Sequence, residues 1–221
     1  MANTQKSKIF GAAKRKGFAG YDIIGNIAIV KFSREERLKD KKKFANQFLK
    51  EIKNVRTILE KRNKFSGRLR TQKTKYLAGE KTKEAIYKEN SCIFRLNVDS
   101  CYFSPRLASE RKEITNFVKK GEKVLVMFGG VAPFAITIAK LSKANEVYSI
   151  ELGRECSKYA LENVKRNKLN NVKIIQGDVK KVKIKDKFDR IVMPRPNLKD
   201  SFIDIAFSLI KNKGFIYYYG F

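Results

Sequence analysis

The chain has 221 residues and carries 50 Lys and Arg against 22 Asp and Glu, a net charge of +28. Such an excess is rare in enzymes of small acidic metabolites and is typical of proteins that neutralise a phosphate backbone. Histidine is absent, which excludes histidine-based acid–base chemistry, and the three cysteines show neither metal-ligand spacing nor a disulfide framework. We therefore expect no metal, no membrane segment and a reducing, cytoplasmic location.

The first half of the chain carries most of the basic charge, with 31 of the 50 Lys and Arg in residues 1–120. Residues 1–20 are expected to form a flexible basic tail. Residues 21–32 (YDIIGNIAIVKF) are predicted as two strands, or as one long strand broken at Gly25-Asn26. Residues 34–62 place apolar side chains at a spacing near 3.6, which predicts one or two amphipathic helices with a Lys- and Arg-rich outer face.

Residues 64–100 are predicted to form short strands, and residues 103–118 a helix that opens with Ser-Pro. From residue 121 the pattern becomes a regular alternation. Strands are expected at 124–128, 147–151, 172–176, 190–194 and 215–219, and helices at 133–141, 155–167 and 200–211. This alternation is typical of a parallel, doubly wound sheet. The fold class is therefore α/β: a Rossmann-like domain at 101–221 preceded by a small basic α/β domain at 21–100.

Three features stand at the carboxyl ends of the first three predicted strands, where such sheets bind ligands. The first is Phe128-Gly129-Gly130-Val131, whose glycines let a ligand approach the backbone before a helix N-terminus. Glu151 ends the second strand and is able to accept both hydroxyls of a ribose, although an ordinary solvated carboxylate would also fit there. Asp178 follows the third strand and is placed to accept a hydrogen bond from an adenine amino group. Because neither GxxxxGK[ST] nor GxGxxG is present, the favoured ligand is an adenosyl group without phosphates, S-adenosylmethionine.

The stretch from Tyr21 to Phe221 resembles the archaeal and eukaryotic tRNA methyltransferases that modify nucleotide 37. The resemblance rests on these segments: YDIIGNIAIVKF, LAGEKTKEAIYKENSCIFRLNV, YFSPRLASER, VLVMFGGVAPF, NVKIIQGDV, FDRIVMPRP and KGFIYYYGF. It implies a methyltransferase domain, a preceding domain that grips tRNA, and an anticodon loop as the target.

The resemblance also implies catalytic roles. By position, Arg70 matches an arginine that stabilises charge on the guanine oxygen, and Glu110 matches the general base. Tyr102 and Arg106 lie in the same active-site motif as Glu110. The chemistry is consistent, because guanine N1 becomes nucleophilic only after it loses its proton. Without the resemblance, Arg70 reads as one more basic surface residue and Glu110 as a helix-start carboxylate.

The chain departs from the family pattern at several positions. Val126 replaces an acid, so an electrostatic partner of the methionine ammonium is expected to be lost. Gly129 replaces an alanine and Ala132 a glycine. A motif that usually begins Asn-Leu-Pro reads Pro194-Arg195-Pro196, which puts Pro194 at the cofactor site without a side-chain hydrogen bond to the base. Asn197 would replace it only if the loop were repacked. The family's small N-terminal domain and final strand hairpin are not found, so the last strand is expected at an exposed edge of the sheet.

These features favour methylation of carbon 7 of 4-demethylwyosine at position 37 of tRNA-Phe, because an electron-rich ring carbon needs no prior deprotonation. The enzyme is expected to be a monomer. Methylation of guanosine 37 at N1 is the close alternative, and an enzyme with both activities is a third. A tRNA-binding protein with impaired catalysis is the alternative of another class.

Overall fold

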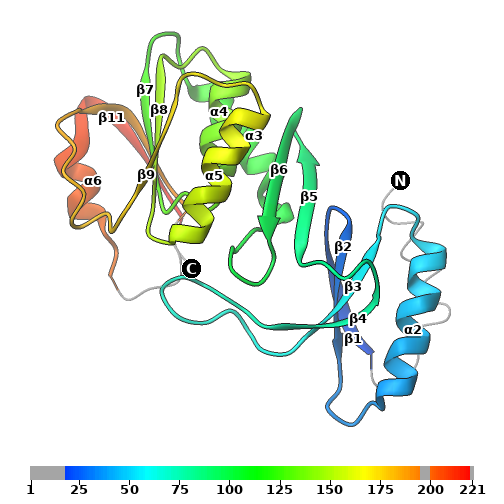
Figure 1. The fold of residues 1–221 in the computed structure, drawn as a ribbon. Coiled ribbons are helices and arrows are strands. Elements are labelled where there is room, and N and C mark those ends of the chain that lie inside the picture. Colours follow the sequence, from blue (N-terminus) through cyan, green and yellow to red (C-terminus); the bar gives the residue numbers. More distant parts are fainter. Residues whose placement is uncertain (1–17, 195–199, 220–221) are drawn as a thin grey trace. The chain divides into compact units, whose positions relative to one another are not determined.

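The computed structural model describes residues 18–194 and 200–219 (Figure 1). The chain divides into two compact units, which are described separately. The N-terminal unit comprises the chain up to Phe65 together with Gln72–Tyr87, and the C-terminal unit comprises Ser66–Thr71 together with the chain from Lys88 onward. The division thus falls at residue 87, before the expected boundary at residue 100, and assigns one short loop of the first half to the second unit.

In its described residues, the N-terminal unit is a four-stranded sheet with one helix on it. Its strands are β1 (Phe18–Ile24), β2 (Ile27–Phe32), β3 (Thr57–Lys61) and β4 (Thr74–Gly79), in the order β1-β2-β3-β4. Strands β2 and β3 are parallel and the other neighbours are antiparallel. The helix α2 (Leu38–Glu51) packs Ala45 and Phe48 against a core that includes Val30 and Ile58.

Two expectations for this unit are wrong and one is confirmed. Phe18–Gly20 belong to β1 rather than to a tail, while residues 1–17 lie outside the described residues. The predicted helices do not run to residue 62, because the helix ends at Glu51 and Leu59 lies in β3. Pairing of β3 with β2 and β4 overrides the helical spacing of its apolar residues. The break at Gly25-Asn26 is confirmed, since it is the turn between β1 and β2.

A hairpin of β5 (Glu84–Glu89) and β6 (Cys92–Asn97) follows. Its two turn residues, Asn90 and Ser91, both have positive φ, as a tight hairpin with the right-handed strand twist requires. Two buried asparagines bind the backbone of β6: Asn163, in helix α5 (Arg154–Arg166), and Asn167, which follows the last residue of that helix. Asn163 Oδ1 accepts from the Arg95 N–H (2.8 Å), and Asn167 Oδ1 accepts from the Ile93 N–H (2.9 Å). These amides satisfy backbone groups that would otherwise be left unpaired.

The C-terminal unit contains the predicted parallel sheet, which confirms the fold class. Its strands are β7 (Lys123–Met127), β8 (Glu146–Glu151), β9 (Val172–Gln176), β10 (Phe188–Met193) and β11 (Ile210–Tyr218), in the order β11-β10-β7-β8-β9. All four pairings are parallel. The order reverses at β7, so the carboxyl end of β7 is the switch point at which such sheets bind ligands.

Helices cover both faces of this sheet (Figure 1). Helix α4 (Pro133–Leu141) and α5 lie on one face, with the short η1 (Pro105–Leu107) and α3 (Ala108–Phe117) beside α4, and α6 (Ile203–Leu209) lies on the other. Strand β11 is at the edge of the sheet, as expected, and its Phe215 is 56% exposed. Within the described residues, no helix combines the length and the apolar character needed to cross a bilayer.

Candidate cofactor and base-binding site

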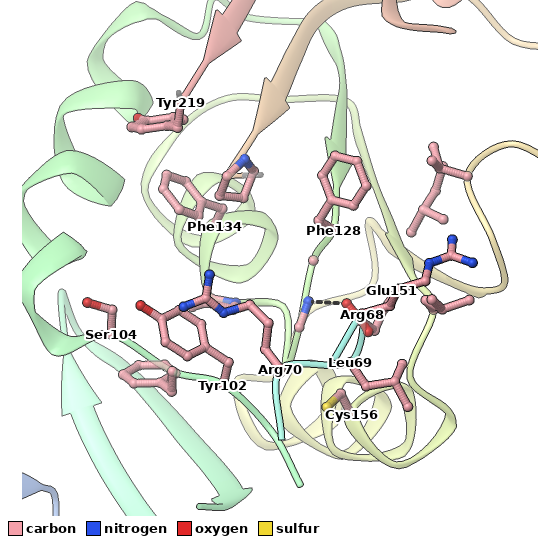
Figure 2. A pocket seen from close by; sticks show the side chains of 18 of the residues that line it. Arg68, Leu69, Arg70, Tyr102, Ser104, Phe128, Phe134, Glu151, Cys156 and Tyr219 are labelled. Carbon is pink, nitrogen blue, oxygen red and sulfur yellow. Dashed lines mark hydrogen bonds between the residues drawn. The ribbon is translucent and has the colours of Figure 1, made fainter. Parts of the chain in front are cut away.

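A pocket opens in the C-terminal unit where β7, β8 and β9 end (Figure 2). It gathers residues from the Ser66–Thr71 loop, the stretch before α3, the β7–α4 turn and the ends of β8, β9 and β10, together with Phe202 before α6 and Tyr219 after β11. The lining includes Arg68, Leu69, Arg70, Tyr102, Phe128, Gly129, Gly130, Phe134, Glu151, Asp178, Pro194, Phe202 and Tyr219.

The β7–α4 turn holds its shape through backbone conformations that the sequence motif supplies. Gly130 has φ +57°, and its N–H donates to Glu151 Oε2 (2.8 Å). Gly129 donates its N–H to the Ile150 carbonyl (2.8 Å), and a Cβ at this position would lie 2.0 Å from Ser149 Oγ. A Cβ at residue 129 would force Ser149 Oγ to move, which gives a physical reason for glycine in place of the alanine usual in this motif. Ala132, by contrast, adopts a left-handed conformation (φ 65°) at the position where glycine is usual.

Glu151 ends β8 and points into the pocket with both oxygens bound to backbone amides. Oε1 accepts from Gly153 N–H (2.6 Å) and Oε2 from Gly130 N–H (2.8 Å). Burial raises the pKa of this carboxyl, and the hydrogen bonds from Gly153 and Gly130 oppose that shift. Each carboxylate oxygen accepts up to two hydrogen bonds, so the group retains capacity for a ribose hydroxyl.

Asp178 lies beyond β9 and is held from two sides. Its Oδ1 accepts from the Lys180 N–H (3.0 Å), and its Oδ2 accepts from Arg68 Nη2 (2.8 Å). The Lys180 hydrogen bond and then the Arg68 ion pair lower the pKa of this carboxyl. Asp178, which was predicted to bind the adenine amino group, is thus an ionised hydrogen-bond acceptor at the pocket wall.

Arg70 and Tyr102 are stacked in the pocket, although they come from distant parts of the chain. The guanidinium carbon of Arg70 lies 4.1 Å from the centre of the Tyr102 ring, a cation–π contact (Figure 2). Arg70 Nε is buried and has no hydrogen-bond partner among the described residues. A buried donor without a partner costs free energy, and an acceptor on a bound ligand would relieve that cost.

Glu110 and Arg106 lie outside this lining. Glu110 is exposed in the first turn of α3, and its Oε2 accepts a hydrogen bond from the hydroxyl of Tyr219 (3.3 Å), which does line the pocket. Burial and then the carboxylate of Glu110 raise the pKa of Tyr219 to about 12. Arg106 is an exposed residue of η1. Glu110 therefore connects to the pocket through a tyrosine.

Three other residues singled out in the sequence are Val126, Val131 and Pro194. The two valines are buried and lie outside the pocket lining, whereas Pro194 is part of it. Val131 is fully buried, and its carbonyl accepts from Asn163 Nδ2 (3.2 Å). Val126 is also fully buried, in β7 and in register with Ser149 and Val192. The valine that stands at residue 126 in place of the usual acid is thus a residue of the core. Pro194 lines the pocket, whereas Arg195, Pro196 and Asn197 lie outside the described residues.

Sequence reasoning missed several residues of the site. Arg111 is 1% exposed, forms a bidentate ion pair with Glu89 and donates Nη2 to the Ser104 carbonyl (3.0 Å), which holds the segment that carries Tyr102. Also missed were Phe134, Phe202 and Tyr219. Phe202 packs edge-to-face on the predicted Phe128 (ring centres 5.1 Å apart), and Phe134 packs at a tilt on Tyr219 (5.8 Å). Arg68 was visible as the first arginine of GRLR, but its partner was not, because Asp178 is 110 residues away.

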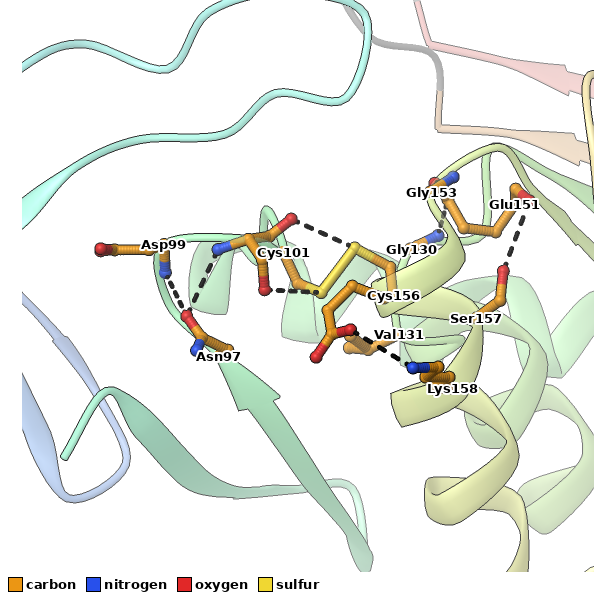
Figure 3. Close-up of a disulfide and its surroundings, with 12 residues drawn as sticks. Asn97, Asp99, Cys101, Gly130, Val131, Glu151, Gly153, Cys156, Ser157 and Lys158 are labelled. Carbon is orange, nitrogen blue, oxygen red and sulfur yellow. Dashed lines mark hydrogen bonds and ion pairs between the residues drawn. A yellow bond between two sulfur atoms is a disulfide. The ribbon is translucent and has the colours of Figure 1, made fainter.

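The expectation that the cysteines form no disulfide is wrong. Cys101 is bonded to Cys156, with Cα atoms 5.5 Å apart, which ties the segment before Tyr102 to the first turn of α5 (Figure 3). Cys156 also lines the pocket. The 55-residue separation places the two thiols together only in the folded chain. Cys92 is a free, buried cysteine, and burial raises the pKa of its thiol.

The pocket fits an adenosyl ligand better than a metal or a polyphosphate. Ionised and amide-bound carboxylates at Glu151 and Asp178 accept hydrogen bonds from hydroxyl and amino groups but repel phosphates. A Cβ at Gly130 would meet only the Tyr102 carbonyl oxygen, at 3.7 Å, so this glycine leaves room for a ligand to approach the backbone. In the described part of the chain, no three potential metal ligands lie together.

Comparisons with known proteins match both parts of the chain. Residues 85–221 match the TRM5/TYW2 methyltransferase domain, and residues 11–82 match the TYW2 N-terminal domain. A Pyrococcus abyssi protein named tRNA (guanine(37)-N(1))-methyltransferase Trm5b is 41% identical over 91% of this chain and 59% of its own length. A Nanoarchaeum equitans protein named tRNA (guanine(37)-N(1))/4-demethylwyosine(37)-methyltransferase Taw22 is 47% identical over 68% of this chain and 49% of its own. A Saccharolobus solfataricus protein named tRNA 4-demethylwyosine(37)-methyltransferase Taw21 is 32% identical over 90% and 76%, respectively.

Solved structures of proteins named Trm5b and TYW2 are similar to this chain in fold. The crystal structure of Trm5b from Pyrococcus abyssi has a TM-score of 0.79 and 39% identity, and the match covers 90% of this chain and 59% of that one. The structure of M. jannaschii TYW2 in complex with AdoMet has a TM-score of 0.64 and 30% identity, covering 87% and 72%. The chain spans roughly half to three fifths of the first two curated relatives. Because the family's methyltransferase domain matches more than half of its residues, the chain belongs to the TRM5/TYW2 methyltransferase family.

Proposed function

We propose that this protein is an S-adenosylmethionine-dependent methyltransferase that acts on the purine at position 37 of tRNA. The observation that carries the proposal is the convergence of Glu151, Asp178 and the Gly129-Gly130 turn with the Arg70–Tyr102 stack in one pocket. The relatives named as position-37 methyltransferases support the same substrate, and the net charge of +28 suits a polyanion.

The residues divide the work by chemistry. Glu151 and Asp178 would hold the ribose and adenine of S-adenosylmethionine, which supplies an electrophilic methyl group when bound. Tyr102 offers a ring for a base that has been flipped out of the anticodon loop, and Arg70 offers a fixed positive charge to an exocyclic oxygen of that base. Arg111, paired with Glu89, orients the segment that carries Tyr102.

Carbon 7 of 4-demethylwyosine is the favoured target. Methylation of N1 requires a base in contact with the purine, but Glu110 is exposed, lies outside the pocket lining and is bonded to Tyr219. Pro194 lines the pocket where a hydrogen-bonding asparagine is usual. An electron-rich ring carbon needs neither group before it attacks. The new carbon–carbon bond forms as the methyl–sulfur bond breaks, and carbon 7 loses its proton to water only afterwards, which restores the aromatic ring. Guanosine-N1 methylation is the second candidate, and the relative named for both activities supports an enzyme with both.

The test uses two tRNA-Phe substrates, one with guanosine 37 and one with 4-demethylwyosine, each incubated with S-adenosylmethionine labelled in the methyl or in the carboxyl group. Nucleosides are then identified by mass spectrometry. Methyl label in the tricyclic base alone is the expected result, and label in 1-methylguanosine alone would overturn the preference for carbon 7. Carboxyl label in the product would mean transfer of the aminocarboxypropyl group and would overturn methyl transfer.

A variant separates the two chemistries. Glu110→Gln should leave carbon-7 methylation largely intact, whereas any N1 methylation that uses this carboxylate as its base should be lost, because the N1 proton then has no acceptor. If no product forms with either tRNA and calorimetry detects no cofactor binding while tRNA still binds, the chain is a tRNA-binding protein.

A further inference from the structure

In the Ser66–Thr71 loop, Ser66 and Thr71 pair with each other and close a turn of the four residues between them. Two side-chain contacts, one from Arg68 and one from Arg70, hold this loop on the pocket. Ser66 and Thr71 exchange backbone hydrogen bonds in both directions (3.0 and 3.2 Å), and the Arg70 N–H donates to the Gly67 carbonyl (3.1 Å). Gly67 and Arg70 both have positive φ, which the closed turn requires. Because the backbone is constrained in this way, the side chains of residues 68–70 move together rather than independently.

The first anchor is the ion pair between Arg68 and Asp178. The atoms Arg68 Nη2 and Asp178 Oδ2 are 2.8 Å apart, and the aspartate side chain is 15% exposed while the arginine is 57% exposed. Asp178 is fixed in turn by the Lys180 N–H and by its place directly after β9 and Gly177. The partner of Arg68 is thus a rigid point of the parallel sheet.

The second anchor is the stack of Arg70 on Tyr102. Tyr102 follows Cys101, which is bonded to Cys156 of α5, so this ring is also tied to the rigid part of the unit. Leu69 lies between the anchors and lines the pocket (Figure 2). The guanidinium of Arg70 makes no hydrogen bond through Nε, so the stack on Tyr102 and the hold on the loop must place it.

We propose that Arg68 is a positioning residue: its ion pair with Asp178 docks the Ser66–Thr71 loop on the pocket and thereby sets Arg70 over Tyr102. Arg68 acts through Arg70 and does not itself contact the base. Asp178 retains acceptor capacity on both oxygens, so an adenine amino group binds there without displacing Arg68. The kinetic consequence rests on the proposed function, whereas docking of the loop does not.

Docking is measured by fluorescence, because the chain contains no tryptophan. Leu69→Trp places a single reporter in the loop at a site that is 47% exposed. In this background, Arg68→Ala should shift the emission to the red and increase quenching by acrylamide, and Arg68→Lys should restore part of the protection. The matched control is Arg95→Ala, which removes an ion pair of the same length to Glu162 outside the pocket lining and should leave the reporter unchanged. Equal quenching with and without Arg68 would overturn the inference even if the protein methylates neither base.

Kinetics show whether Arg68 acts through Arg70. In the otherwise unmodified protein, Arg68→Ala should lower kcat about fivefold, the scale of one partly exposed ion pair, while the Kd of S-adenosylhomocysteine by calorimetry changes less than about twofold. Arg68→Lys should recover part of kcat. The opposite split, a weaker cofactor with kcat unchanged, would mean that Arg68 acts on adenine through Asp178 and would overturn its role toward Arg70.

Discussion

Arg70 is stacked on Tyr102 with its guanidinium 4.1 Å from the ring centre, and the two residues reach the pocket from opposite sides of the β5–β6 hairpin in the sequence. The stack gives the pocket a planar cation next to an aromatic ring at the place where a flipped base would enter. It also makes each residue a determinant of the other's position.

The stack predicts a separable effect of the ring on turnover. Tyr102→Ala should lower kcat about tenfold or more, because the flipped base loses the ring that orients it, and should weaken tRNA binding by a smaller factor, because phosphate contacts dominate affinity. Tyr102→Phe keeps the ring and should stay near wild type. Single-turnover methylation and filter binding of the same tRNA are the measurements. A loss of affinity without a loss of turnover would contradict a role of Tyr102 at the base.

Cofactor binding should depend on pH through Glu151. Burial raises the pKa of this carboxyl, so it gains a proton on acidification at a higher pH than an exposed glutamate does. The affinity for S-adenosylhomocysteine, measured by calorimetry, should therefore fall as the pH drops through that shifted range.

The sign of the stability effect is opposite. The folded state holds the Glu151 proton more tightly than the unfolded chain, so its contribution to stability is largest at acid pH and is lost as the pH rises to the shifted pKa. Glu151→Gln should weaken binding at neutral pH and flatten the pH dependence of affinity. A dependence that persists in this variant would assign it to another group.

Gly129 and Ser149 should be energetically coupled. Gly129→Ala places a Cβ 2.0 Å from Ser149 Oγ and is expected to cost about 1–3 kcal/mol of unfolding free energy. In a Ser149→Ala background the nearest side-chain atom is Cβ at 3.4 Å, so the same change should cost little. Urea denaturation of the four proteins of this cycle gives the coupling, and additive effects would show that the serine simply rotates away.

Reduction should destabilise the protein through the Cys101–Cys156 bond. Opening a loop of 55 residues restores about 4 kcal/mol of chain entropy to the unfolded state, which lowers the melting temperature by roughly 10 °C. Calorimetry with and without a phosphine reductant measures the shift. Cys156→Ala should melt low in both conditions, whereas Cys92→Ala should keep the reductant-dependent shift. A melting temperature of the unmodified protein that ignores the reductant would show that the two thiols are not bonded in solution.

The exposed face of α2 should contribute to tRNA binding. It forms a shallow groove lined by Arg37, Lys39, Asp40, Lys42, Lys43, Asn46, Gln47 and Lys50, in which the single carboxylate is paired with Arg37 (2.8 Å). Replacing Lys39, Lys42 and Lys43 with Gln should weaken tRNA binding and reduce the slope of log K against log salt by about 2, at about 0.7–0.9 for each phosphate contact.

The charge-matched control for α2 replaces Lys143, Lys165 and Lys168 with Gln. These lysines lie near the C-terminal ends of α4 and α5, shortly before β8 and β9 begin. The pocket lies at the opposite, carboxyl ends of the strands. Their loss should leave the slope nearly unchanged. Equal slopes for the two triple variants would mean that charge acts through the net value rather than through α2.

The sequence by itself determined the parallel sheet of the C-terminal unit and the strand ends that meet at its ligand site. Short apolar strands in regular alternation with amphipathic helices permit one kind of sheet, and the order of a parallel sheet places Gly129-Gly130, Glu151 and Asp178 at one edge. These are local signals, because strand ends and helix starts are set by neighbouring residues.

Only the tertiary structure decided which distant residues meet. Leu59 has helical spacing but lies in β3, because backbone pairing with β2 and β4 outweighs local periodicity. The partners Arg68 and Asp178, Tyr219 and Glu110, and Cys101 and Cys156 are each separated by 55 to 110 residues. Their contacts depend on how the chain is folded back on itself, and no local spacing records them. The same reason hid the core position of Val126, since the direction in which a strand residue points is set by the sheet that surrounds it.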